Sequence, residues 1–209
     1  MTTPTRSVLI RTRERLIDER NYWRDLYTGL LLSTTARNIN LQKQIASVVY
    51  KKVSLVDPGC ILVGGAPRDW YFDREASDLD FFFVPNKDVS IEDVMSLLDM
   101  TVVSRVGTAD HHLCKQMPGP LKLWESEFNG IKIQLVEISS KDLMSIAVDE
   151  LHLSISKIYW TPEKGIQIHQ EFKETVRSKV ITGKDGYDLK SKYAQKILYK
   201  YRDLGYSFG

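Results

Sequence analysis

Residues 64–83 read GGAPRDWYFDREASDLDFFF, and this stretch decides how the rest of the chain is interpreted. The two glycines follow a short apolar run, Cys60–Val63, which is typical of a buried strand. Residues 66–72 suit a two-turn helix, because a proline in the first helical turn leaves no hydrogen bond unmade. Asp73 stands where this helix should end, and aspartate tolerates the left-handed backbone found there. A second strand, Leu79–Val84, is predicted to follow.

The turn between the first strand and the helix has the composition of a phosphate-binding loop. Gly64 and Gly65 let backbone N–H groups approach an anion, and the N-terminus of the helix adds partial positive charge. Arg68 could bind a triphosphate through two hydrogen bonds, while Asp69 could anchor a ribose hydroxyl or Arg68 itself. The alternatives are a tight turn without a ligand and a surface ion pair of little energetic value.

Two acids open the second strand. Asp78 and Asp80 are two residues apart, so in a strand both carboxylates point to the same face. Carboxylates this close repel each other unless a cation compensates, and Mg²⁺ prefers oxygen ligands that it shares with substrate phosphates. The alternative is an acidic strand entry in a solvated loop. The position of the pair, just after a glycine loop and a helix, favours the metal site.

These residues together resemble a known family. Gly64-Gly65-Ala66-Pro67-Arg68-Asp69, then eight residues, then Asp78-Leu79-Asp80, is similar to the head-domain signature of the CCA-adding enzymes and bacterial poly(A) polymerases. That family belongs to the DNA polymerase beta superfamily of nucleotidyltransferases. Its pattern is G-G-x-V-R-D, a short helix, and D-x-D on the next strand. The resemblance covers residues 59–180 or so and is that of a minimal, phage-type member.

The resemblance implies a site and a reaction. Asp78 and Asp80 would each ligate Mg²⁺, two ions in all, and Gly64 and Gly65 would cradle the β- and γ-phosphates with Arg68 beside them. The substrate would be a nucleoside triphosphate, and the acceptor a hydroxyl, most simply an RNA 3′ end such as that of tRNA. The implied fold is an α/β palm with a mixed sheet, flanked by N- and C-terminal helices.

A third acid is expected on a neighbouring strand, flanked by apolar residues. The matching place is Ile133-Gln134-Leu135, where glutamine stands instead of an acid. Glu137 is the nearest alternative catalytic acid, but strict alternation places it on the face opposite Gln134 unless a bulge turns it. Gln134 could offer a neutral carbonyl ligand near the nucleotide. Three readings stay open: two acids suffice, Glu137 substitutes, or the site binds nucleotide without turnover.

The composition and net charge of the chain indicate the class of protein to which these motifs belong. The chain has 209 residues, 43% hydrophobic and 27% charged, which is ordinary for a globular domain with one substantial core. A net charge of +2 gives no strong attraction to nucleic acid as a whole. Two cysteines cannot build a disulfide framework, and no apolar run approaches the roughly 20 residues that a membrane helix needs. Without a signal-peptide pattern, we expect a cytoplasmic protein that does not bind membranes.

The remaining sequence divides into three predicted parts: an N-terminal helical segment, 1–56; the palm, 57–148; and a small hairpin-plus-helix region, 149–209. Helices are predicted at 7–32, 40–56, 91–100, 170–180 and 189–204, a strand at 101–106, and hairpins at 121–138 and 155–168. The last helix carries lysines interleaved with tyrosines. Such a helix either grips RNA or docks its tyrosine face on the protein.

The sequence therefore predicts a magnesium-dependent nucleotidyltransferase. The alternatives are a nucleotide- or RNA-binding module with a degraded site, and a toxin-like transferase that uses a different acceptor.

Overall fold

A computed structural model describes residues 39–85, 103–106, 122–128, 130–138, 148–149 and 151–209. All of them belong to one compact unit, Arg37–Gly209. The helices predicted at 7–32 and 91–100 lie outside the described residues, and the three-part division of the chain stays a prediction.

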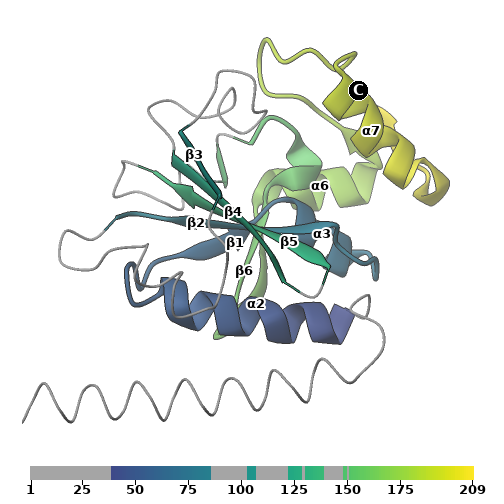
Figure 1. Cartoon of the computed structure of the whole chain (residues 1–209). Helices are drawn as coiled ribbons and strands as arrows, with labels where there is room; N and C mark the ends of the chain where they lie inside the picture. Colours follow the sequence, from purple (N-terminus) through teal and green to yellow (C-terminus); the bar gives the residue numbers. More distant parts are fainter. Residues whose placement is uncertain (1–38, 86–102, 107–121, 129, 139–147, 150) are drawn as a thin grey trace, which may run out of the picture. The chain divides into compact units, whose positions relative to one another are not determined.

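A seven-stranded mixed sheet forms the centre of this unit, in the order β3-β4-β5-β2-β1-β6-β7 (Figure 1). All neighbouring strands are antiparallel except β2 and β5, which are parallel. The strands are β1 Ile61–Val63, β2 Asp78–Phe83, β3 Val103–Val106, β4 Lys122–Phe128, β5 Ile131–Glu137, β6 Ile158–Thr161 and β7 Gly165–Ile168. A two-stranded sheet, β8 Val180–Ile181 with β9 Ser207–Phe208, lies apart from it.

The helices are α2 Ile39–Val53, α3 Gly65–Tyr71, α6 Gln170–Ser178 and α7 Lys192–Tyr201, with short 3₁₀ turns η1 Ser154–Ser156 and η2 Arg202–Leu204. In Figure 1, α2 runs along the sheet, and α6 and α7 gather towards the C-terminus, away from α2. Within the described part of the chain, the helices are too short or too polar to cross a membrane. The predicted α/β fold with a mixed sheet and flanking helices is confirmed.

The apolar core continues on both faces of β2. Phe82 packs with Ile61, Val63 and Val136 in one cluster. Phe81 and Phe83, which alternation carries to the opposite face, are fully buried as well. Both faces of this strand are therefore covered, which holds the acids at its start in a fixed position.

A second core unites the C-terminal elements. It contains Phe172 from α6, Ile197 and Tyr201 from α7, and Ile155 from η1. Phe72, at the end of α3, packs against it. This core attaches α7 to α3, although more than 100 residues separate them in the sequence.

Local predictions were accurate around turns and less so at helix ends. Asp73 has the expected positive φ of 53°, and Gly130 has φ 73° in the hairpin turn between β4 and β5. Ile155 and Ser156, predicted as strand, lie in the 3₁₀ turn η1 instead. The helix predicted to end at Val180 stops at Ser178, because Lys179 takes a left-handed conformation and residue 180 enters β8. The last helix begins at Lys192 rather than at residue 189, since Ser191 caps it.

Candidate functional site

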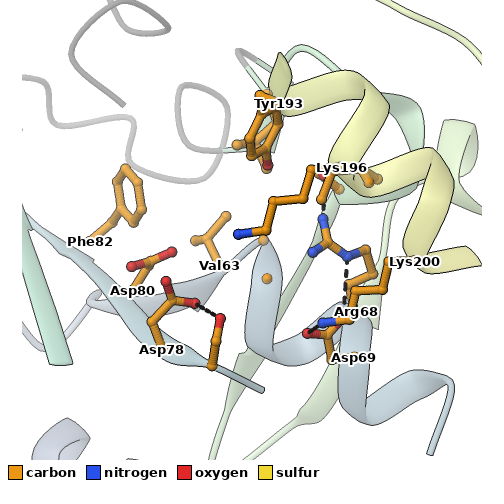
Figure 2. Close-up of a pocket in the computed structure, with 15 residues that line it drawn as sticks. Val63, Arg68, Asp69, Asp78, Asp80, Phe82, Tyr193, Lys196 and Lys200 are labelled. Atoms are coloured by element: carbon orange, nitrogen blue, oxygen red, sulfur yellow. Dashed lines mark hydrogen bonds and ion pairs between the residues drawn. The ribbon is translucent and has the colours of Figure 1, made fainter. Parts of the chain in front are cut away.

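A cavity of about 290 Å³ opens where β1, α3, β2 and α7 meet. The end of β1 and the glycine turn supply one wall, and the start of β2 supplies another. The third wall is α7, from which Tyr193, Lys196 and Lys200 line the cavity. Three consecutive elements within residues 61–83 and one distant helix therefore form a single pocket, and its acids and Arg68 are ones that the sequence motifs indicated (Figure 2).

The two glycines differ in how strictly the backbone requires a residue without a side chain. Gly64 has φ 75° and ψ −108°, a backbone conformation that residues with a side chain rarely adopt. Its N–H donates to the carbonyl of Ile158 at 3.0 Å, so this group, which the sequence offered to a phosphate, continues the pairing of β1 with β6. A Cβ added to Gly65 would lie 3.6 Å from Oδ1 of Asp78 and 3.9 Å from Nη2 of Arg68. Both are ordinary van der Waals distances, so a side chain here would fill space beside Asp78 without a clash.

The acids lie as the spacing predicted, on one face of β2 and into the pocket (Figure 2). The hydroxyl of Ser77 donates to Oδ1 of Asp78 at 3.0 Å. Oδ1 of Asp80 is buried and has no hydrogen-bond partner among the described residues. Burial raises the pKa of Asp80 well above its usual value, and the negative charge of Asp78 raises it further. The positive charges of Lys132 and Arg68 oppose this rise, but no described residue donates a hydrogen bond to Oδ1 of Asp80.

This arrangement fits a hard divalent cation. Two carboxylates offer only oxygen donors, which Mg²⁺ prefers, and a buried oxygen without a partner gains most from a cation. Nowhere in the described ranges do three or more acidic, histidine or cysteine side chains gather as a metal cluster. Asp78 and Asp80 are therefore the side chains that could hold a cation here, with room in the cavity for further oxygen ligands.

Arg68 and Asp69 form the buried link between α3 and α7. Arg68 is 4% exposed and donates from Nε to the Tyr201 hydroxyl and from Nη1 to Oγ of Ser156, both at 2.9 Å. Asp69 accepts from Nζ of Lys200 at 2.5 Å and from the Tyr201 hydroxyl. Nε of Arg68 lies 3.5 Å from Oδ1 of Asp69.

Protein donors therefore engage both carboxylate oxygens of Asp69. Of the two roles that the sequence allowed for this residue, the structure shows the contact with Arg68. A contact with a ribose stays a prediction.

The glutamine that replaces the third acid lies beside Asp80. The parallel register pairs Gln134 with Asp80, and the antiparallel register pairs it with Glu125 on β4. Gln134 is 2% exposed and donates from Nε2 to Oε1 of Glu125 at 2.6 Å. The same carboxylate oxygen lies 2.7 Å from Nζ of Lys132. Asp80, Gln134 and Glu125 therefore follow one another across three strands on the same face of the sheet.

Glu137 lies elsewhere. It pairs with Phe83 at the far end of β5, in a register that runs from Lys132 to Glu137 without a bulge. Alternation places it on the face opposite Asp80, and it does not line the pocket. The bulge that would turn Glu137 inwards is not found between these two strands.

Sequence reasoning missed two contributions. Glu125 could have been found by counting back from the predicted turn, because a two-residue Asn-Gly hairpin places residue 125 opposite residue 134. The pocket-lining side chains of α7 had only a general signal, the alternation of lysine and tyrosine. Of its tyrosines, Tyr201 is fully buried whereas Tyr199 is 74% exposed, so the helix docks one face and leaves the other in solvent.

This chain is similar to known proteins in structure but matches none in sequence. No protein-family model matches the chain, and no curated protein matches it in sequence. Among solved structures, a CCA-adding enzyme in complex with CTP superposes with a TM-score of 0.52 at 12% identity, over 88% of this chain and 43% of that one. The Thermotoga maritima CCA-adding enzyme in complex with tRNA superposes with a TM-score of 0.56 at 11% identity. The fold is that of the CCA-adding enzymes.

A third structure, of a tRNA-processing enzyme complex, superposes with a TM-score of 0.52 at 12% identity, over 78% of this chain. The Thermotoga maritima match covers 88% of this chain and 42% of that enzyme. This chain therefore spans less than half the length of the structures that share its fold. At these identities the likeness establishes only that this chain shares its fold with part of the CCA-adding enzymes.

Proposed function

We propose that this protein is a magnesium-dependent nucleotidyltransferase that transfers a nucleoside monophosphate from a nucleoside triphosphate to a hydroxyl acceptor. The observation that carries the proposal is the pair Asp78 and Asp80, aligned on one strand, with a buried oxygen that accepts no hydrogen bond from the described residues and faces a cavity. The acceptor that fits best is an RNA 3′ end, of tRNA in particular. Structures that share the fold carry CTP in one case and tRNA in another.

The reaction joins the acceptor oxygen to the α-phosphorus and releases pyrophosphate. Asp78 and Asp80 would hold Mg²⁺, which when bound supplies positive charge for the triphosphate and makes the acceptor hydroxyl more acidic. The protein's own part is positioning and electrostatics. Gly65 allows the triphosphate to approach the backbone beside Asp78, and Arg68, held rigid by Tyr201, adds fixed positive charge to that wall.

The proposal assigns turnover to two carboxylates. The register of β2 and β5 keeps Glu137 out of the pocket, whereas Gln134 stands next to Asp80 and can offer a neutral oxygen. In the described residues no other acid lines the pocket apart from Asp69, which is engaged by α7. That observation favours a second candidate function, a nucleotide-binding module without turnover.

One experiment separates the two functions. The protein is incubated with Mg²⁺, total tRNA and each of four labelled nucleoside triphosphates, and incorporation and pyrophosphate release are measured. A transferase incorporates label, and Asp78→Ala and Asp80→Ala each abolish incorporation while leaving the folded state intact by circular dichroism. Asp185→Ala, an exposed acid outside the pocket, is the matched control and keeps full activity.

Incorporation that survives in both acid variants would refute the assignment of the site. Nucleotide-induced thermal stabilisation without incorporation of any of the four nucleotides would favour the binding module. Incorporation into another acceptor, with tRNA left unlabelled, would keep the chemistry and replace the proposed partner.

A further inference from the structure

Three cationic side chains line the wall of the pocket that faces the two acids: Arg68, Lys196 and Lys200. Two of them are committed to the protein. Arg68 donates to the Tyr201 hydroxyl, and Lys200 forms a 2.5 Å ion pair with Asp69. Their charge is therefore partly neutralised within the link between α3 and α7. The third cation has no such contact with the described residues, so all of its donors are available to a polyanionic ligand.

Lys196 is that cation. It lies one helical turn before Lys200 on α7, and it forms no ion pair or hydrogen bond within the described part of the chain. Figure 2 shows its side chain extending from α7 into the pocket, with the ammonium group directed towards Val63, on the side where Asp78 and Asp80 lie. The ammonium thus occupies the space between the acids and α7.

The helix fixes where Lys196 starts. Ser191 caps α7 by accepting from the N–H of Ala194 at 3.3 Å, and Ala194 itself is fully buried. Ile197, directly after Lys196, is 4% exposed in the C-terminal core. A turn later, Lys200 is tied to α3. The helix can neither rotate nor slide without exposing apolar surface, so the base of the Lys196 side chain stays at the edge of the pocket.

A lysine at this place has a specific chemical use. A triphosphate held at Asp78 and Asp80 through cations would place its phosphate chain in the same cavity, which α7 borders. A lysine ammonium is a mobile point charge with three donors, a common ligand for terminal phosphates. The alternative is a lysine that only water surrounds. Lys192, one turn earlier, and Lys196 are both exposed, but of the two only Lys196 lines the pocket.

We infer that Lys196 binds the β- and γ-phosphates of the incoming nucleotide and the pyrophosphate product. The identity of the ligand rests on the proposed function, but the anion site itself rests on the geometry of α7. The C-terminal helix is then part of the substrate-binding machinery.

The test uses inorganic tripolyphosphate with Mg²⁺ as the probe, because it carries the phosphate chain without a base or a ribose. Its affinity is measured by calorimetry for the full chain, for Lys196→Met, and for the matched control Lys192→Met. We expect Lys196→Met to weaken tripolyphosphate binding roughly tenfold, the effect of losing one charged hydrogen-bonding contact. We expect Lys192→Met to bind as the unchanged protein does, and Lys196→Arg to recover most of the loss.

A second readout separates phosphate recognition from a general structural effect. Nucleoside monophosphates lack the β- and γ-phosphates, so Lys196→Met should leave their affinity unchanged. If the enzyme is active, the KM for the triphosphate rises in Lys196→Met while the variant keeps its thermal stability. Equal losses for monophosphate and tripolyphosphate would overturn the inference, as would an equal loss in Lys192→Met or no loss in Lys196→Met.

The experiments distinguish failure of the proposed function from failure of the phosphate-binding role of Lys196. If no nucleotide is incorporated but tripolyphosphate binding still depends on Lys196, the proposed function fails and the anion site stands. If incorporation requires Asp78 and Asp80 but KM is unchanged in Lys196→Met, the function stands and this inference fails. An unchanged protein that does not bind tripolyphosphate at all also overturns it.

Discussion

Replacing Tyr201 with phenylalanine removes a single hydroxyl from the contact between α3 and α7. That hydroxyl accepts from Nε of Arg68 at 2.9 Å and donates to Oδ1 of Asp69. The ring keeps its packing, for example against Phe72 at a centroid distance of 5.1 Å. The variant therefore tests the two hydrogen bonds of the Tyr201 hydroxyl separately from the packing of its ring.

The size of the effect follows from burial. The Arg68 and Asp69 side chains are 4% and 3% exposed, so water cannot replace the lost hydroxyl easily. A hydrogen bond to a charged group contributes about 1.5–3 kcal/mol, and two are lost here. Part of this is recovered, because Asp69 keeps Lys200 and can close its 3.5 Å separation from Arg68. We expect Tyr201→Phe to lower the free energy of unfolding by about 2–3 kcal/mol, or roughly 4–12 °C in Tm.

Urea unfolding followed by circular dichroism measures this loss, with Tyr199→Phe as the matched control. Tyr199 lies on the same helix but is 74% exposed, so its hydroxyl is already solvated. We expect the control to lie within about 0.5 kcal/mol of the unchanged protein, with an equal slope against urea. A loss below about 0.5 kcal/mol for Tyr201→Phe, or an equal loss in both variants, would refute the reasoning.

Three further predictions concern the sheet, the turn and the alkaline range. Gln134→Glu places a second carboxylate about 2.6 Å from Oε1 of Glu125 and should lower the free energy of unfolding by about 1–3 kcal/mol. The double variant Glu125→Gln with Gln134→Glu should recover most of this loss. Urea unfolding of both single variants and the double variant measures it, and no recovery in the double variant would contradict the prediction. Gly64→Ala forces a side chain onto φ 75° and should cost about 1–3 kcal/mol in the same assay, while Gly65→Ala, whose new Cβ meets ordinary contacts, should cost less; the opposite order would show that the turn is not strained. Burial raises the pKa of Tyr50 to about 12. Because the unfolded chain loses this proton near pH 10, the contribution of Tyr50 to stability is full below pH 10 and falls by up to about 2 kcal/mol as pH rises to 12, so in the same assay Tyr50→Phe should lose less stability over this range than the unchanged protein.

The part of the site that is local in sequence could be predicted. Residues 64–83 carry their own signals: a glycine that only a positive φ explains, a proline at the helix start, and two acids at strand spacing. Each of these depends on neighbours a few residues away, so the pattern is visible without the fold. Asp78 and Asp80 accordingly lie in the pocket together, as their spacing indicates.

The part that depends on long-range packing could not be predicted. Nothing near Lys196 or Lys200 in the sequence indicates that α7 returns to α3, since the contacts with Asp69 join residues 131 and 132 positions apart. Glu125 is an intermediate case, because its neighbour Gln134 follows from the hairpin turn once the strands are paired. The position of Glu137 could be predicted from the sequence. Strict alternation places it on the face opposite Gln134, and the register of β2 and β5 agrees.

The attachment of α7 to α3 has a consequence for the order of folding. A contact between residues 69 and 200 closes a long loop, and such contacts form late because chain entropy opposes them until most local structure exists. A partly folded chain that has formed only the sheet would present the acids without the wall that completes the cavity. Ligands that bind in this cavity should therefore slow global unfolding and leave the early steps of refolding unchanged. Ligand binding would then show that α7 has docked and the whole unit has folded.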